Sequence, residues 1–279
     1  MDKTLLVIGN GVWGKKISTL FQSWGFEVNQ FGARSFLQLD LERKREIFNI
    51  DIIWIATTPE LQIKIISSIS KCHSNSIFIL EKPFFRDLNE KFQFSEVVKE
   101  SKLNLRSSSP WVYSDIWLKS KKKLLDLFGP LQISIMRSGP SNNKSILPYL
   151  DWLSHDVQLI SDLFNSEAKI MYLDRSNHKF KSDSNNIKIG FEDGSSLDLS
   201  GGLSKSKISS WVARDKKDNC LRIDFNSKSF QHFGHNQILI ESYKSPPNDN
   251  PLLNMIQNFT NLPNYEKAES YFRWQEILI

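Results

Sequence analysis

The first strand, glycine-rich loop and helix of this 279-residue chain constrain its fold more than any other stretch. Residues 4–8 (TLLVI) form a short apolar run without period-2 alternation, which is typical of a parallel strand buried on both faces. A G-x-G-x-x-G loop follows at residues 9–14, and residues 12–24 then carry apolar side chains near helical spacing, before Gly25 ends the helix. A second strand is predicted at residues 26–31. This order predicts a dinucleotide-binding strand–helix–strand unit.

Each glycine of such a loop has its own role. The first permits a tight turn, the second lets the backbone approach the pyrophosphate, and the third packs the helix against the strand. The N–H groups at the start of the helix then face the phosphates. The residues expected to contact a dinucleotide are Gly9, Asn10, Gly11, Val12, Trp13 and Gly14. The alternative is a glycine loop with a structural role only.

The end of the second strand decides between the two nicotinamide dinucleotides. An NAD site usually places an acidic residue there to hold the ribose hydroxyls, whereas this chain has FGARS at residues 31–35 and no acid before Asp40. An arginine beside a hydroxyl suits a 2′-phosphate. Arg34 and Ser35 therefore favour NADP(H) over NAD(H), and the alternative is that Arg34 is a solvated loop residue.

Strands and helices continue to alternate up to residue 83. Residues 51–59 form a buried strand with its end, residues 60–71 carry apolar side chains on one helical face, and residues 76–83 contain the next strand. Such alternation predicts a parallel, doubly wound sheet with right-handed crossovers. Ligands of these sheets lie beyond the carboxyl ends of the strands. The further residues expected at the cofactor edge are Thr57, Thr58, Pro59, Glu81 and Lys82.

The pattern changes near residue 108, where we place a domain boundary. Beyond a helix at residues 114–127, most segments are predicted strands with turns between them. These strands are expected at residues 131–136, 169–173, 187–191, 196–199, 207–213, 220–225 and 237–243, and two final helices at 251–261 and 267–279. We therefore predict an α/β Rossmann domain at residues 1–108 and an α+β domain at 109–279, with an open, mainly antiparallel sheet and C-terminal helices that pack back.

One helix, predicted at residues 149–164, interrupts the strands and carries a polar stripe. Asp151 and His155 lie one turn apart, and Asp162 falls on the same side. A carboxylate one turn from an imidazole can orient it and tune it for proton transfer. The alternative is a capping aspartate followed by a structural histidine.

Four features in this order resemble the glucose–fructose oxidoreductase / inositol dehydrogenase family (Gfo/Idh/MocA). They are the glycine loop at 9–14, IATTP at 55–59, EKP at 81–83 and DWLSHD at 151–156. The sequence NPLLNMIQNFTN at 250–261 is similar to a late helix of that family. The chain departs from the family in carrying Leu153 where a small residue is usual, and in being shorter than most members.

The resemblance implies a Rossmann domain followed by an α+β domain whose open sheet often forms the oligomer interface. It also implies hydride transfer between a nicotinamide and a carbon bearing a hydroxyl, carbonyl or imine, often on a sugar. The family's catalytic lysine falls on Lys82, and its aspartate and histidine fall on Asp151 and His155. His155 would then move the hydroxyl proton with Asp151 as its partner, while Lys82 would stabilise negative charge on the reacting oxygen.

Composition excludes several other classes. The chain has no apolar run of the roughly 18 residues that a membrane span needs. Cys72 and Cys220 have no His or Cys partner at ligand spacing, so we expect neither a disulfide nor a metal site, and we expect a reducing cytoplasm. The net charge is +5, but 31 acidic residues are dispersed among 36 basic ones. The basic cluster at 119–123 is expected to be a solvated helix face, so nucleic acid is not an expected partner.

The leading hypothesis is therefore an NAD(P)-dependent dehydrogenase or reductase acting on a sugar, nucleotide sugar or cyclitol, as a cytoplasmic homo-oligomer (dimer or tetramer) formed through the C-terminal sheet. The alternatives are an imine or tetrapyrrole reductase on the same fold, or a catalytically silent cofactor-binding regulator or scaffold. Trp111, Tyr113 and Trp152 are candidates for an aromatic wall of the substrate pocket, with a place in the core as the alternative. The small-molecule substrate itself is not indicated by any motif.

Overall fold

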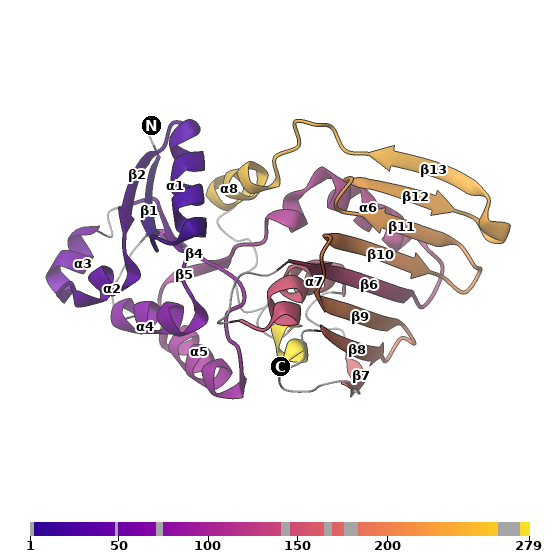
Figure 1. Ribbon diagram of the computed structural model, residues 1–279, viewed down its shortest axis with the longest axis horizontal. Helices are drawn as coiled ribbons and strands as arrows, with labels where there is room; N and C mark the ends of the chain where they lie inside the picture. The colour runs from indigo at the N-terminus through magenta and orange to yellow at the C-terminus, as the bar shows by residue number, and fades with distance from the viewer. Residues whose placement is uncertain are drawn as a thin grey trace. The chain divides into compact units, whose positions relative to one another are not determined.

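The computed structural model describes residues 3–47, 50–70, 75–140, 146–164, 169–175, 184–261 and 274–279. The chain divides into two compact units, one formed by residues 1–108 with 264–277 and 279, the other by residues 109–263 with 278. Each unit is built on its own sheet (Figure 1). No helix in the described part of the chain is long and apolar enough to cross a membrane.

The first unit contains a five-stranded parallel sheet in the order β2-β1-β3-β4-β5. Its elements are β1 (Thr4–Ile8), α1 (Val12–Ser23), β2 (Glu27–Phe31), α2 (Ala33–Gln38), α3 (Leu41–Ile47), β3 (Ile52–Ile55), α4 (Pro59–Ile69), β4 (Ile77–Leu80), α5 (Leu88–Glu100) and β5 (Asn104–Ser107). This is the doubly wound arrangement that the alternating sequence pattern predicts.

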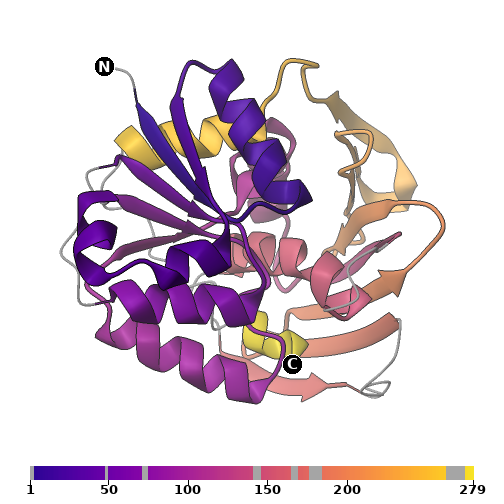
Figure 2. The same cartoon turned by 60° about the vertical axis from the view of Figure 1, so that its left-hand side comes forward.

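Helices cover both faces of this sheet because alternate strand residues point to opposite sides. Leu6 and Ile8 of β1 join a hydrophobic cluster with residues of α2, α4 and α5, among them Phe94. Figure 2 shows α4 and α5 lying side by side. On the other face Trp54 of β3 meets Phe21 of α1, with ring centroids 5.6 Å apart. All four residues of β3 are buried, as expected for a central parallel strand.

The second unit contains an eight-stranded sheet in the order β13-β12-β11-β10-β6-β9-β8-β7 (Figure 1). Its elements are the short turn η1 (Pro110–Tyr113), α6 (Asp115–Asp126), β6 (Gln132–Gly139), α7 (Pro148–Phe164), β7 (Ile170–Asp174), β8 (Ser184–Phe191), β9 (Ser196–Leu203), β10 (Ile208–Arg214), β11 (Cys220–Asp224), β12 (Ser229–Phe233), the turn η2 (His235–Gln237), β13 (Leu239–Lys244) and α8 (Pro251–Asn261). The sheet is mainly antiparallel, and the predicted fold class is confirmed; β6 and β9 pair in parallel.

One face of this sheet is covered by α6 and α7. Trp211 of β10 marks that face, because its ring meets Trp117 of α6 edge-on at 5.1 Å while its Nε1 donates to Asp156 of α7 at 2.7 Å. Along β6 the buried residues alternate with exposed ones such as Ser134 and Met136. The second face is therefore open, with mainly polar side chains along the central strands.

Two glycines allow α7 to lie close to the sheet. A Cβ at Gly139 of β6 would stand 2.4 Å from the ring of Trp152, and one at Gly201 of β9 would stand 2.4 Å from Cγ of Leu153. Leu153, the large residue that departs from the family pattern, is fully buried there. The missing side chain on β9 therefore supplies the space that Leu153 occupies.

The predicted set of strands and helices in the second half of the chain differs from the structure in a few places. The strand β12 (Ser229–Phe233) is absent from the predicted set, because its sequence SFQHF mixes polar and aromatic residues. The final helix expected at 267–279 falls largely outside the described residues, and residues Glu276–Leu278 form a short 3-10 turn. Cys72 also lies outside the described residues, whereas Cys220 is a buried free thiol.

Candidate functional site

In the glycine loop after β1, the first and third glycines are closely packed and the second is open. Gly9 has φ +139°, and a Cβ there would stand 2.2 Å from the carbonyl oxygen of Ala56. A Cβ at Gly14 would stand 2.1 Å from the carbonyl oxygen of Gly9. At Gly11, in contrast, a Cβ would meet nothing within 4 Å. The first and third glycines thus pack the loop against β3 and α1, while the second leaves open space over the loop.

The N-terminus of α1 fits a phosphate group. Gly11 is its N-cap residue and no side chain of the described residues caps the helix. The N–H of Lys15 closes the first turn by donating to the Gly11 carbonyl at 3.0 Å. The N–H groups of the first turn and the positive end of the helix dipole therefore suit the pyrophosphate of a dinucleotide.

The structure places the two residues predicted to bind a 2′-phosphate at the start of the helix that follows β2. Arg34 and Ser35 lie in the first turn of α2 and are exposed, and Arg34 forms no ion pair within the described ranges. Asp40, the next acid, accepts a hydrogen bond from the N–H of Arg43 at 2.7 Å and so belongs to the start of α3. The end of β2 thus presents a cation and a hydroxyl rather than a carboxylate.

The ends of β3 and β4 are joined by a glutamine that the sequence analysis did not single out. Thr58 is the N-cap of α4, Pro59 occupies its first turn, and Gln62 is fully buried one turn later. The Gln62 amide donates to the carbonyl of Glu81 at 2.7 Å and to that of Thr57 at 3.4 Å. A glutamine on the apolar face of an otherwise amphipathic helix is the signal that could have identified it.

Lys82 is held at the carboxyl end of β4. Its Nζ donates to the carbonyl of Ser108 at 3.0 Å and lies 3.6 Å from Oε2 of Glu81. The side chain is only 8% exposed, and the Lys82–Pro83 peptide bond is cis. Because an ammonium has three N–H donors, this arrangement leaves Lys82 a donor for a further oxygen. A fixed cation of this kind can stabilise negative charge that develops on a reacting oxygen.

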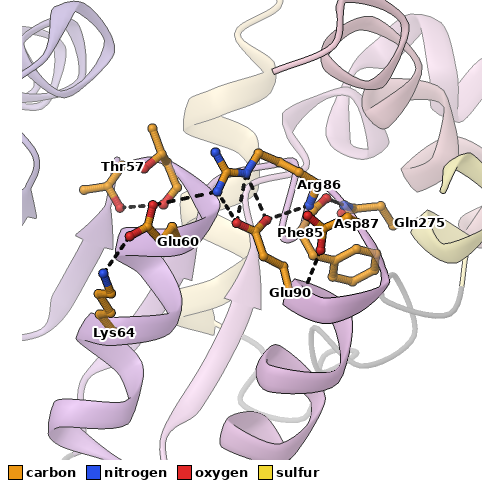
Figure 3. A network of polar contacts seen from close by, with 9 residues as sticks. Thr57, Glu60, Lys64, Phe85, Arg86, Asp87, Glu90 and Gln275 are labelled. Atoms are coloured by element: carbon orange, nitrogen blue, oxygen red, sulfur yellow. Dashed lines mark hydrogen bonds and ion pairs between the residues drawn. The ribbon is translucent and has the colours of Figure 1, made fainter. Parts of the chain in front are cut away.

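The loop that follows Lys82 is fixed at both ends by polar contacts (Figure 3). Gln275, in the C-terminal segment of the same unit, accepts from the N–H of Phe84 and donates to the carbonyl of Phe85, both at 2.9 Å. Arg86 then binds Glu90 of α5 through Nε and its backbone N–H, and lies 3.8 Å from Glu60 of α4. These contacts tie the lysine-bearing loop to two helices and to the end of the chain.

In the second unit, Asp151 and His155 lie one turn apart on α7 and are both half-buried. Tyr149, two residues before Asp151, is buried; burial raises its pKa, against the opposing effects of Arg175 and a hydrogen bond with Asn185. The phenol is therefore neutral near pH 7. Asp151 and His155 are therefore the partly accessible acid–base groups in the first half of this helix.

Two other aspartates anchor α7. Asp156 accepts from Nε and Nη2 of Arg137 on β6 and from the indole of Trp211. Asp162, which the spacing places in the polar stripe with His155, accepts from the Trp117 indole at 2.7 Å and pairs with Lys121 at 2.9 Å, both on α6. Asp162 therefore belongs to the contact between α6 and α7. The basic cluster of α6 is also partly paired, since Lys123 lies 2.7 Å from Glu241.

The three aromatic candidates make contacts within their own unit. Trp111 packs edge-on against Phe225 at 5.5 Å, and Tyr113 against Phe259 at 5.8 Å. Trp152 lies against Gly139 and is partly exposed. Tyr113 is 5% exposed and belongs to the core, whereas Trp111 and Trp152 keep part of their surface accessible. That they line a substrate pocket stays a prediction.

The structure brings the cofactor candidates of the first unit together and keeps Asp151 and His155 together on α7. Lys82 belongs to the first unit and the Asp–His pair to the second. That all three act on one substrate therefore stays a prediction. No group of three His, Cys, Asp or Glu residues that could hold a metal ion occurs among the described residues.

No protein-family model and no curated protein sequence matches this chain. Solved structures match its fold along almost the whole length. UDP-N-acetylglucosamine 3-dehydrogenase from Acidithiobacillus ferrooxidans has a TM-score of 0.78 at 14% identity, over 100% of this chain and 96% of that chain. KijD10, a 3-ketoreductase from Actinomadura kijaniata in complex with NADP and TDP-benzene, has a TM-score of 0.71 at 12% identity, over 99% of this chain and 95% of that chain. The myo-inositol 2-dehydrogenase from Lactobacillus plantarum has a TM-score of 0.67 at 16% identity, over 99% of this chain and 95% of that chain. At these identities the likeness shows the fold.

Proposed function

We propose that this chain is an NAD(P)-dependent oxidoreductase that transfers a hydride between a nicotinamide and a hydroxyl or carbonyl carbon of a sugar, nucleotide sugar or cyclitol. The observation that carries the proposal is the placement of Lys82. Its ammonium is fixed at the carboxyl end of β4, in the same sheet edge as the open glycine loop. Ligands of doubly wound sheets bind at this edge, so the lysine would stand beside the cofactor.

The similar solved structures support the same class. The names of three of them describe a nucleotide-sugar dehydrogenase, a ketoreductase with NADP and a cyclitol dehydrogenase. The resemblance to the Gfo/Idh/MocA family in the glycine loop, EKP triplet and Asp151–His155 helix points in the same direction. These supports are independent of each other, since one comes from the fold and the other from short sequence motifs.

The roles of the chain's own residues follow from their positions. The bound nicotinamide would accept or supply the hydride. His155 would take the hydroxyl proton when an alcohol is oxidised and return it when a carbonyl is reduced, with Asp151 orienting the imidazole. Lys82 would donate a hydrogen bond to the reacting oxygen and stabilise the negative charge that builds up on it.

NADP(H) is the preferred dinucleotide in this proposal. The exposed guanidinium of Arg34 and the hydroxyl of Ser35 would bind the 2′-phosphate. We further propose that the open face of the eight-stranded sheet forms a homo-oligomer interface and that the protein acts in the cytoplasm, where Cys220 would stay reduced.

The test is a screen of sugars, nucleotide sugars and cyclitols for oxidation or reduction linked to NADP(H) or NAD(H). Lys82→Ala is expected to lower kcat by about 10²–10⁴-fold, as removal of a preorganised electrostatic or proton-transfer group does. His155→Asn is expected to lower kcat by a factor in the same range. Lys64→Ala is the matched control, because its exposed ammonium pairs with Glu60 on the outside of α4. An active Lys82→Ala variant would remove the lysine from the mechanism.

The cofactor preference has its own measurement. Arg34→Ala is expected to weaken NADPH binding by about 10-fold or more while leaving NADH binding unchanged, because only NADPH carries the 2′-phosphate. Arg43→Ala, which removes an exposed arginine paired with Glu46 on α3, serves as the control. Tighter binding of NADH than NADPH by the unmodified protein would contradict the preference, and binding of neither would contradict the proposed function.

A further inference from the structure

Glu81 is the residue of the EKP triplet for which the sequence suggests no chemistry, and the structure places it in an unusual setting. Oε1 accepts a hydrogen bond from the indole N–H of Trp13 at 2.7 Å and a second from that of Trp54 at 2.9 Å. Oε2 faces Nζ of Lys82 at 3.6 Å. The two indoles thus turn the carboxylate so that its other oxygen is directed to the lysine.

Burial of the Glu81 carboxylate lowers folding stability unless nearby groups compensate its charge. The residue is 7% exposed, and a buried carboxylate is stable only when its charge is compensated. Its hydrogen bonds come from two neutral N–H groups, and the positive charge that pairs with it among the described residues is Lys82, whose side chain is itself buried. The two side chains therefore form a charge pair whose geometry is set by the tryptophans.

The two tryptophans reach Glu81 from different parts of the unit. Trp54 lies inside β3 and is fully buried, so it provides a rigid donor. Trp13 lies in the first turn of α1, within the glycine loop, and is 40% exposed, with Nζ of Lys16 5.3 Å from its ring centroid. The loop that is open to a dinucleotide is thus connected to the Lys82 ammonium by one side chain and one carboxylate.

We propose that Glu81 is a positioning residue that presets the ammonium of Lys82, and that Trp13 is the contact through which the glycine loop sets the position of Glu81. This inference rests on the proposed function and goes beyond it, because it gives roles in turnover to a buried glutamate and to a loop tryptophan. Glu81 touches neither the substrate nor the cofactor in this account, and acts only through Lys82.

The experiment compares Glu81→Gln and Trp13→Phe with Trp24→Phe, a matched change at a half-buried tryptophan that packs on Phe21 in the same unit. The measurements are kcat and KM for the substrate found in the screen, and Kd for NADPH from fluorescence titration. Glu81→Gln is expected to lower kcat by about 10–100-fold and Trp13→Phe by several-fold, as loss of a supporting contact to a functional group does. For Glu81→Gln, KM and the NADPH Kd are expected to stay within about 3-fold of the unmodified values, as for a group that acts mainly in the transition state.

The decisive arm repeats Glu81→Gln in a Lys82→Ala background, with residual turnover followed at high enzyme concentration. A residue that acts through Lys82 has no further effect there, whereas a purely structural residue lowers turnover by the same factor in both backgrounds. Equal factors, or an unchanged kcat for Glu81→Gln, would overturn the inference. Trp13→Phe keeps the test decisive if Glu81→Gln fails to fold, because Trp13 is 40% exposed and its replacement by the smaller phenyl ring leaves the buried core intact.

The outcomes also separate this inference from the proposed function. An unmodified protein that binds neither NADPH nor NADH would remove both. An unmodified protein that binds NADPH and turns over a substrate, with a Glu81→Gln variant of equal kcat, would remove the positioning role alone.

Discussion

Two buried carboxylates, one in each unit, accept tryptophan N–H groups but are balanced in different ways. Glu81 accepts hydrogen bonds from the indole N–H groups of Trp13 and Trp54. Asp156 accepts a hydrogen bond from the indole N–H of Trp211 at 2.7 Å and two more from the guanidinium of Arg137, which is 1% exposed. Both carboxylates also stand next in sequence to a candidate catalytic residue, Lys82 or His155.

The difference lies in the cation. Arg137 engages both oxygens of Asp156, so that charge pair is complete and joins α7 to the sheet. Lys82 stands 3.6 Å from Glu81, beyond hydrogen-bond distance, and donates to the Ser108 carbonyl instead. A closed ion pair suits an anchor, whereas an ammonium with a donor to spare suits a site that must receive a ligand. The geometry of the cation therefore distinguishes Asp156, which anchors a helix, from Glu81, which we propose positions Lys82.

The largest expected effect comes from breaking the closed pair. Arg137→Met would leave Asp156 buried without a cation, which typically costs about 3–5 kcal/mol of folding free energy. Chemical denaturation measures it, with the exposed Arg222→Met on β11 as the control. Changing both partners to apolar residues of similar volume is expected to recover most of the loss. A loss below about 1 kcal/mol for Arg137→Met would contradict the anchor role.

A smaller effect is expected when one indole is removed from each carboxylate. Trp54→Phe and Trp211→Phe are matched changes at fully buried rings. Hydrogen bonds to charged groups contribute about 1.5–3 kcal/mol, and we expect Trp54→Phe to lie in that range. Trp211→Phe should cost less, because Asp156 keeps its guanidinium partner. Equal costs, from urea unfolding of both variants, would show that the cation does not distinguish the two sites.

The smallest expected effect concerns Asp215, a carboxylate whose hydrogen-bond donors among the described residues are all neutral. It accepts from the backbone N–H groups of Phe128, Lys217 and Asn219 and from the Asn219 amide. Burial would raise its pKa, but these hydrogen bonds outweigh burial and lower it below the ordinary 3.8. The contribution of these hydrogen bonds to folding stability is therefore present above pH 3.8 and is lost as the pH falls through the lowered pKa of Asp215.

Asp215→Asn is accordingly expected to cost about 1–2 kcal/mol near pH 7, the usual cost of losing such a capping group. The difference from the unmodified protein should shrink as the pH falls below 3.8. Denaturation curves at several pH values check it. A difference that is constant with pH would mean that the neutral donors do not favour the charged form.

The local parts of the fold could be predicted from the sequence. The strand β1, the glycine loop and α1 depend on short-range features, namely apolar runs, helical spacing and glycines. The same holds for the placement of Thr57, Glu81 and Lys82 at strand ends, because strand ends in a parallel sheet meet at one edge. The parallel pairing of β6 with β9 was not predictable in this way, since two strands and a helix separate them in the chain.

The contacts that define the candidate site depended on residues far apart in sequence. No local pattern joins Trp13 and Trp54 to Glu81, or Gln275 to the backbone of Phe84. Asp162 shows the converse, because helical spacing placed it beside His155 while its partners come from α6. Periodicity identifies the face of a helix, but the neighbouring element decides which polar group becomes an anchor.

If a nicotinamide dinucleotide binds at the open glycine loop, as we propose, a side chain at Gly11 should prevent it, and Gly11→Val provides the test. A Cβ there meets no protein atom within 4 Å beyond its chain neighbours, so the variant is expected to fold, at a capping cost of at most about 1–2 kcal/mol. Titration of NADPH, followed by fluorescence, compares it with the unmodified protein and with Thr19→Val on an exposed position of the same helix. We predict binding by the unmodified protein and by Thr19→Val, and a loss of at least about 10-fold in affinity for Gly11→Val, because the new side chain blocks approach to the backbone. Equal affinity in all three proteins, or no binding by any of them, would show that the glycine loop does not bind the dinucleotide.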